Sequence, residues 1–250
     1  NLAGTVKGRK AAKHAVSDWM DIEKERGISV TSSAMQFNYD GYCINILDTP
    51  GHQDFSEDTY RTLMAADSAV MVIDGSKGVE AQTIKLFKVC VMRHINKFDR
   101  EARDPYELMG EIEDVLGIRT CPVNWPIGCG KNFKGVYDRF TKKITTFTAA
   151  MGGAKEVASR EFDVDQEDVE SVIGPVYHSQ LLDDIELLDG ASDELDMERV
   201  QRGDLSPVFF GSALTNFGVE TFLEHFLKMT TPPLSRKTLT GEVDPFDPHF

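Results

Sequence analysis

Positive charge is scarce in this sequence. Of its 250 residues, 27 are Lys or Arg and 41 are Asp or Glu, so the formal net charge is -14. This deficit excludes a broad basic surface that binds DNA or RNA by releasing counterions. Any contact with RNA must be local, and the basic segment at residues 7–14 is a candidate for it.

Long apolar runs and paired cysteines are also lacking. No apolar run approaches the ~20 residues that span a bilayer, and no signal-peptide pattern opens the chain. The four cysteines have no C-x-x-C spacing, which argues against a zinc site or a disulfide framework. We therefore expect a cytoplasmic protein with its own core, and neither a membrane nor DNA as its partner.

Two apolar runs that end in an aspartate indicate an α/β fold. Residues 43–47 read as a buried strand that ends at Asp48, and residues 69–73 read as a strand that ends at Asp74. The stretch between them, residues 56–66, has the composition of a helix. The order strand, helix, strand implies a parallel sheet that binds its ligands at the carboxyl ends of the strands.

The next segment breaks this alternation. Helices are predicted at residues 80–93 and 105–116, on either side of Asn96. A helix that ends near His94 leaves only Ile95 before Asn96, whereas a strand that crosses the sheet takes ~5 residues. The sequence therefore predicts that residues are missing between His94 and Asn96.

An insert interrupts the main pattern at residues 123–204. It is expected to hold a hairpin (residues 133–137 and 144–147), an acidic surface segment, and helices near residues 173–188 and 193–202. The main pattern resumes with a strand at residues 207–210 and a helix at 219–229. The predicted division is a main domain at 1–122, the insert at 123–204, the last strand and helix at 205–232, and a linker toward a further domain at 233–250.

The strongest local motif is Asp48-Thr49-Pro50-Gly51-His52, at the end of a predicted strand. A phosphate-bound magnesium ion needs a carboxylate of this kind, and the small glycine lets the backbone approach a γ-phosphate. The alternative interpretation is a tight turn with a surface histidine.

Two further motifs fit a guanine base. In Asn96-Lys97-Phe98-Asp99 the carboxylate can accept both N–H groups on the edge of guanine, a donor pair that adenine lacks. A backbone N–H of Ser212-Ala213-Leu214 can donate to the base carbonyl, although an ordinary strand-to-helix turn would look the same. Along the chain the three motifs follow in the order phosphate sensor, base reader and base support. This order predicts that they form one site for a guanine nucleotide.

This order is that of GTPases, and residues 17–30 resemble the first switch of the translational GTPases. The resemblance implies that His52 orients the attacking water and that Ile28 belongs to an apolar gate beside it. It also implies that Ser29, where relatives usually have threonine, ligates magnesium together with Asp48; Thr31 is the nearest other hydroxyl. The switch segments would be residues 5–31 and 48–63.

No Gly-x-x-x-x-Gly-Lys-Ser/Thr phosphate loop occurs in the chain. We expect the first strand, the phosphate loop and its helix to precede Asn1 in the intact protein. The predicted fold is α/β, a P-loop GTPase-like, mostly parallel sheet flanked by helices and interrupted by an α+β insert.

Within the translational GTPases the chain most resembles the bacterial class II peptide-chain release factors, through residues 3–9, 54–63 and 125–130. This resemblance implies Mg²⁺-dependent hydrolysis of GTP to GDP on the ribosome in translation termination, which promotes departure of class I release factors. Two alternatives stay open. One is a translocase of the elongation factor G type, and the other is a non-hydrolysing binding module whose histidine and magnesium ligands are vestigial.

Overall fold

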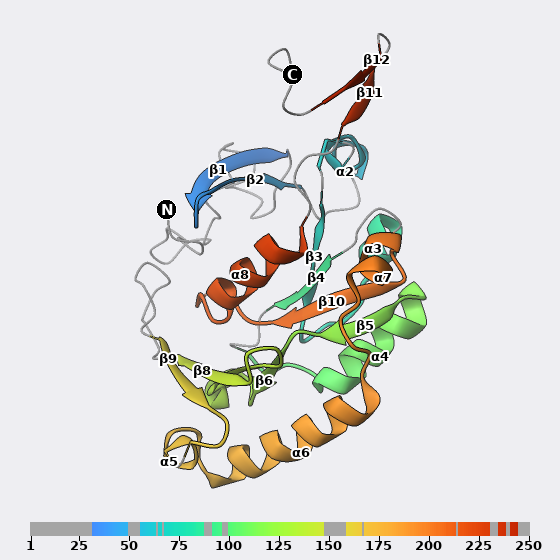
Figure 1. The fold of residues 1–250 in the computed structure, drawn as a ribbon. Helices are drawn as coiled ribbons and strands as arrows, with labels where there is room; N and C mark the ends of the chain where they lie inside the picture. Colours follow the sequence, from blue (N-terminus) through green and yellow to red (C-terminus); the bar gives the residue numbers. More distant parts are fainter. Residues whose placement is uncertain are drawn as a thin grey trace, which may run out of the picture.

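The computed structural model describes residues 32–49, 56–63, 65–66, 68–87, 92–96, 100–147, 159–166, 168–213, 215–230, 235–238 and 241–244. These residues form a parallel sheet with helices on both faces, an antiparallel sheet beside it, and two separate hairpins (Figure 1). The α/β class expected from the sequence is confirmed.

The parallel sheet has four strands in the order β3-β4-β10-β5. Every neighbouring pair in this sheet runs parallel, as the alternation of strands and helices predicts. The strands are β3 (Val70–Asp74), β4 (Met92–Asn96), β10 (Leu205–Phe210) and β5 (Arg119–Pro122).

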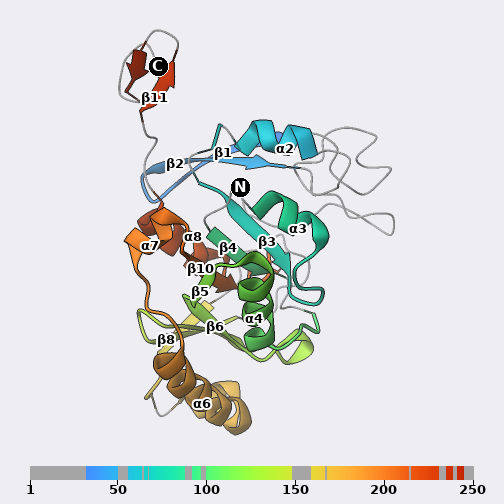
Figure 2. The ribbon, with the colours of Figure 1, turned by 90° about the vertical axis from the view of Figure 1, so that its right-hand side faces the viewer.

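Helices cover both faces of this sheet. Helices α3 (Ala81–Leu86) and α4 (Pro105–Leu116) lie on one side, and α8 (Val219–Met229) lies on the other (Figure 2). Helix α4 begins where the Asp104 carboxylate accepts the N–H groups of Tyr106 and Glu107, and it ends at Gly117, whose φ is 66°. The sequence prediction of helices at residues 105–116 and 219–229 is correct.

Strand β10 divides the core into two halves. Val208 and Phe210 belong to the same hydrophobic cluster as Ile112 of α4. The intervening Phe209 packs against α8, where its ring meets that of Phe222 edge to face at 5.1 Å. Because side chains alternate along a strand, a strand between two helical layers buries side chains on both of its faces.

The predicted insert contains an antiparallel sheet and three helices. The sheet order is β6-β7-β8-β9, and in Figure 1 α6 lies at the opposite end of the molecule from β11 and β12. Among the described helices, none combines the length and apolar character of a membrane span. The elements are β6 (Asn124–Ile127), η3 (Gly130–Asn132), β7 (Gly135–Asp138), β8 (Lys143–Phe147), β9 (Ser159–Asp163), α5 (Val169–Ile173), α6 (Pro175–Ala191) and α7 (Met197–Arg202).

A half-buried carboxylate joins the insert to α4. Asp184 of α6 accepts the indole N–H of Trp125 at 3.1 Å and the hydroxyl of Tyr106 at 3.1 Å. Burial raises the pKa of Asp184, and the two hydrogen bonds offset this rise only in part. Trp125 and Ile144 of the insert share one hydrophobic cluster with α4, so the insert and the parallel sheet have a common core.

The predicted helix at residues 80–93 is wrong at its last two residues, Met92 and Arg93. Helix α3 spans Ala81–Leu86, and Met92–Asn96 form strand β4. Strand β4 is hydrogen-bonded to β3 on one side and to β10 on the other, and this pairing overrides the local helix propensity. Its five residues form a strand that crosses the sheet before Lys97, and the inference that residues are missing between His94 and Asn96 stays a prediction.

Strand β2 (Tyr42–Asp48) is paired in a hairpin with β1 (Ser33–Tyr39), a strand that was not predicted from the sequence. Asp40 and Gly41 connect the two strands with φ values of 47° and 78°, the left-handed conformations of a tight two-residue turn. The strand at residues 43–47 was expected to be buried, but most of β2 is exposed. In the described part of the chain β1 is its sole ladder partner.

The segment expected to be a linker also contains a short hairpin. Strands β11 (Arg236–Thr238) and β12 (Gly241–Val243) pair antiparallel with each other. In Figure 1 this hairpin extends away from the rest of the fold.

Truncating Ile112 should destabilise the fold through the core between α4 and the sheet. Ile112 is fully buried, and Ile112→Ala should lower the free energy of unfolding by about 2–5 kcal/mol. Val115→Ala is the control, because Val115 lies on the same helix but is 44% exposed and should change stability by less than ~0.5 kcal/mol. Urea unfolding checks both, and equal losses would contradict this account of the core.

Candidate functional site

The carboxyl edge of the parallel sheet places Asn96, the first residue of one predicted motif, next to the end of β10, after which the Ser212 motif begins. Strand β4 ends at Asn96 and β10 ends at Phe210. The two strands are parallel neighbours, with Ile95 paired to Phe210. The chain therefore leaves β4 toward Lys97 and leaves β10 toward Ser212 at the same edge, side by side.

The loop after β3 completes this edge. Asp74 ends β3, and its carboxylate accepts the backbone N–H of Ser76 at 3.0 Å and the Ser76 hydroxyl at 2.7 Å. Helix α4 holds the rest of the loop, because Glu111 accepts the N–H of Val79 at 3.1 Å and also pairs with Arg103. These contacts fix a third strand end beside the first two.

The turn that starts at Ser212 is closed by its own backbone. Ser212 and Phe217 exchange two backbone hydrogen bonds of 2.9 and 3.0 Å. Asn216 and Gly218 have φ values of 59° and 70°, and a Cβ on Gly218 would lie 3.0 Å from the carbonyl oxygen of Phe210. Ser212 itself is fully buried.

A buried asparagine fixes the strand before this turn. The Asn124 side chain accepts the N–H of Phe210 at 2.7 Å and donates to its carbonyl oxygen at 3.1 Å. Asn124 is the first residue of β6 and is fully buried. The insert therefore holds the end of β10 by both of its backbone polar groups.

The structure places the acidic residue of the first motif in the hairpin. Asp48 ends β2, is half-buried and pairs with Ser33. The hydroxyl of Thr62 on α2 (Ser56–Leu63) donates to Ser32 at 3.0 Å, so this end of the hairpin lies against α2. Within the described part of the chain β2 has no ladder pairing with β3, β4 or β10.

Of the predicted site residues, the described part of the chain includes Thr49, Asn96, Ser212 and Ala213 as well as Asp48. The others lie outside it. Those outside are Ile28, Ser29, Thr31, Pro50, Gly51, His52, Lys97, Phe98, Asp99 and Leu214.

A second buried polar pair ties the insert to α8. Nε2 of His225 lies 2.6 Å from Oδ2 of Asp138, and both side chains are at least nine-tenths buried. The other oxygen of Asp138 accepts the N–H groups of Phe140 and Thr141 at 2.8 and 2.9 Å. Burial raises the pKa of Asp138, but the hydrogen bonds from His225 and the two N–H groups outweigh it, so the pKa lies below its usual value.

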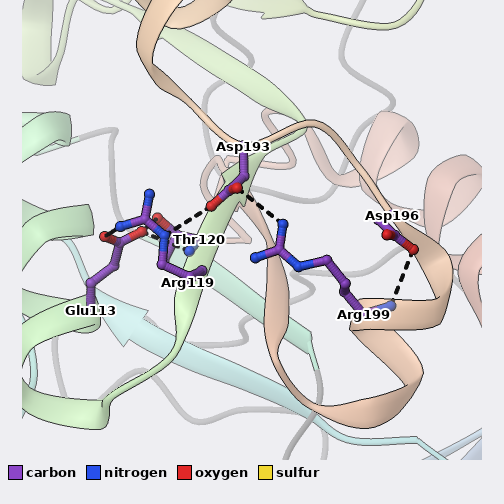
Figure 3. A network of polar contacts seen from close by, with 6 residues as sticks. All are labelled: Glu113, Arg119, Thr120, Asp193, Asp196 and Arg199. Atoms are coloured by element: carbon purple, nitrogen blue, oxygen red, sulfur yellow. Dashed lines mark hydrogen bonds and ion pairs between the residues drawn. The ribbon is translucent and has the colours of Figure 1, made fainter.

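A charged network lies at the opposite, amino-terminal edge of the sheet, where β5 begins (Figure 3). Glu113 accepts the N–H of Thr120 at 2.7 Å and pairs with Arg119 at 2.8 Å. Asp193 pairs with both Arg119 and Arg199, at 2.9 and 3.0 Å. Each of these charges has a partner within the network, so it anchors β5 and α7 and contributes nothing to the candidate edge.

The residues that support the edge were not predicted from the sequence. Asn124 had a signal, because it is a polar residue inside an apolar run. Phe217 had none, since its contacts are with Phe133 and Phe147, far away in the sequence.

Comparison with known proteins identifies relatives over almost the whole chain. The family model of the elongation factor Tu GTP binding domain matches residues 2–232. The peptide chain release factor 3 of Symbiobacterium thermophilum is 59% identical over 255 residues, which cover 100% of this chain and 48% of that protein. The proteins of the same name from Limosilactobacillus reuteri and Streptococcus gordonii are each 55% identical and are covered to 48% of their length.

A solved structure shares the fold. The crystal structure of ttk003000868 from Thermus thermophilus has a TM-score of 0.67, with 23% identity, over 92% of this chain and 39% of that one. At this identity the likeness concerns the fold alone. The chain spans about half the length of the curated relatives that it matches.

The pair of His225 and Asp138 predicts a pH-dependent stability. Asp138→Ala should lower the free energy of unfolding by about 3–5 kcal/mol, because His225 and two N–H groups lose a buried partner. Because the pKa of Asp138 is lowered in the folded protein, its ionised form stabilises the fold fully at pH values above about 3.9, the ordinary pKa of aspartate. This stabilisation is lost as the pH falls through the lower pKa of Asp138 in the folded protein.

The matched variant is Asp138→Asn, which keeps an acceptor oxygen but cannot titrate. Urea unfolding between about pH 5 and pH 3 should show a steeper loss for the wild type than for this variant. Identical slopes for the two proteins would contradict the assigned role of the carboxylate.

Proposed function

The chain belongs to the family of the elongation factor Tu GTP-binding domain, and from this membership we propose that it binds and hydrolyses GTP within a translation termination factor. The support is that relatives named peptide chain release factor 3 are 53–59% identical over nearly all of the chain. Because those relatives are about twice as long, the activity of the whole protein is part of the proposal.

One structural observation carries the nucleotide site. The ends of β4 and β10 lie side by side at the carboxyl edge of a parallel sheet, where such sheets bind their ligands. Asp99, three residues beyond the end of β4, accepts the two N–H groups of guanine in this proposal. The backbone of Ser212, Ala213 and Leu214 donates to the base carbonyl from the neighbouring loop.

The donor chemistry of the chain fits a magnesium ion. Asp48 offers a half-buried carboxylate at the end of β2, and magnesium prefers oxygen ligands of this kind. Ser29 supplies the second oxygen in the proposal. When bound, the ion neutralises charge on the phosphate oxygens.

Hydrolysis in this proposal depends on positioning. Phosphoryl transfer needs an oriented water more than it needs covalent chemistry by the protein. His52 holds and orients that water, and Ile28 limits the access of other solvent to it. The segments 5–31 and 48–63 would then respond to the loss of the γ-phosphate, which makes hydrolysis a conformational signal.

The proposed partner is the ribosome in the cytoplasm, with class I release factors affected indirectly. The net charge of -14 leaves little surface for non-specific RNA binding, so the RNA contact is assigned to the basic segment at residues 7–14. A translocase of the elongation factor G type is less well supported, because the relatives at 53–59% identity are named as release factors.

His52→Ala tests the proposed hydrolysis. In the full-length protein we expect GTP affinity to be retained while ribosome-stimulated turnover falls by ~10²-fold or more, because a positioned catalytic group is lost. Single-turnover phosphate release measures this, with His178→Ala on α6 as the control histidine. Unchanged stimulated turnover in His52→Ala would remove this residue from the mechanism.

Asp99→Asn tests the base assignment. The substitution converts a double acceptor into a donor and an acceptor, which suits xanthine better than guanine. We expect the affinity for GDP to fall by ~10-fold or more and the affinity for XDP to rise, as measured by competition binding. Asp114→Asn, an exposed carboxylate on α4, is the control and should leave both affinities unchanged. An unaltered preference for guanine in Asp99→Asn would refute the assignment.

A further inference from the structure

Three phenylalanine rings stack between the insert and the Ser212 turn. Phe217 closes the turn, Phe133 follows η3, and Phe147 ends β8. The ring centroids of Phe133 and Phe217 are 5.3 Å apart at 15°, and those of Phe147 and Phe217 are 5.0 Å apart at 17°. The turn is therefore held by two rings of the insert from outside its own backbone.

The same stretch of the insert also touches the loop that follows the Asn96 to Asp99 motif. Gly130 has a φ of 57°, and a Cβ built there would lie 3.2 Å from the N of Glu101 and 3.3 Å from the carbonyl carbon of Arg100. Such a distance is tighter than ordinary contact, so the two backbones meet where a glycine allows close approach. Arg100 is the residue directly after Asp99.

The segment that makes both contacts, residues 128–133, is braced internally. The N–H of Asn132 donates to the carbonyl of Cys129 at 3.0 Å, and that of Phe133 donates to Gly130 at 3.2 Å. Just after it, the N–H of Lys134 donates to the carbonyl of Ile127 at 2.8 Å. A turn tied in this way transmits a fixed spacing between the elements on its two sides.

We propose that this segment, with Phe147, is a positioning element for the guanine base, and that Phe133, Phe147 and Gly130 set the spacing between the two base-binding loops. The inference rests on the proposed function and deepens it. The insert then controls how long a guanine nucleotide stays bound, through its contacts with the Ser212 turn and with Arg100 and Glu101, which directly follow the Asn96 to Asp99 motif.

The chemistry of base recognition makes this spacing matter. Asp99 and the Ser212 turn hold opposite parts of one base, and hydrogen bonds weaken steeply once their lengths and angles depart from the optimum. An aromatic pair contributes about 0.5–1.5 kcal/mol, which corresponds to about 2- to 12-fold in an equilibrium constant. Changes in a formed interface appear mainly in the dissociation rate.

The burial of the rings argues against a role in core stability alone. Phe133 and Phe147 are only half-buried, whereas Trp125, Tyr137 and Ile144 of the same sheet are almost completely buried and supply the core of the insert. Phe217, by contrast, is 8% exposed, so the two rings of the insert cover the ring of the turn.

The test measures dissociation of fluorescently labelled GDP and GTP from the full-length protein. Phe133→Leu and Phe147→Leu should each raise the dissociation rate of both nucleotides by about 3- to 10-fold, because both share the base. Phe133→Tyr and Phe147→Tyr keep the stack and should stay within about twofold of the wild type. At saturating GTP, ribosome-stimulated kcat should be unchanged in the leucine variants, while KM rises.

Phe162→Leu is the matched control, because Phe162 lies on β9 of the same sheet and packs against the core. Its dissociation rates should stay within about twofold of the wild type. The inference is overturned if the leucine variants also stay within twofold, or if Phe162→Leu raises the rates as much as they do.

A second pair of variants tests the positioning role if a leucine variant does not fold. Gly130→Ala and Gly117→Ala both force alanine into a left-handed conformation, with φ values of 57° and 66°, but nothing lies within 4 Å of a Cβ at Gly117. Gly130→Ala should raise the dissociation rate at least ~5-fold above that of Gly117→Ala, and equal rates would overturn the inference.

The wild type separates the two possible failures. If guanine nucleotide binds the wild type and dissociates from the wild type and all variants at the same rate, only the positioning role is refuted. A full-length wild type that binds no guanine nucleotide refutes the proposed function, and the positioning role falls with it.

Discussion

Strand β10 is the constraint on which the other elements depend. All six residues from Leu205 to Phe210 are buried, and parallel neighbours pair with both edges of the strand. A strand enclosed in this way needs a helical layer on each face, which α4 and α8 supply. The same enclosure fixes where β10 ends, and so sets the Ser212 turn beside the end of β4.

The insert is part of this arrangement rather than an appendage to it. Its sheet shares a hydrophobic cluster with α4, and polar contacts join the insert to β10, α8 and α4. Asn124 binds the backbone of β10, Asp138 pairs with His225 of α8, and Asp184 accepts hydrogen bonds from α4 and β6. Asn124 therefore connects the insert directly to the strand that ends at the carboxyl edge of the parallel sheet.

The two sides of the proposed nucleotide site differ in how they are held. The base side is braced by backbone closure, by Asn124 and by three stacked rings. On the phosphate side, Asp48 ends a hairpin whose strands pair with each other and whose residues Ile46 and Leu47 are 40% and 37% exposed. This division suits a switch, because segments that change conformation belong to the less densely packed parts of a fold.

The sequence by itself determined the elements whose signals are local. Helix α4 spans the predicted residues and is capped by Asp104 and Gly117, and apolar runs mark β3 and β10. The strand β1 and the tight turn at Asp40 and Gly41 were not predicted. Tertiary structure alone decided that β4 is a strand and that Asn124 binds Phe210, 86 positions away. Propensity and capping act over a few residues, whereas these pairings form only when distant segments pack together.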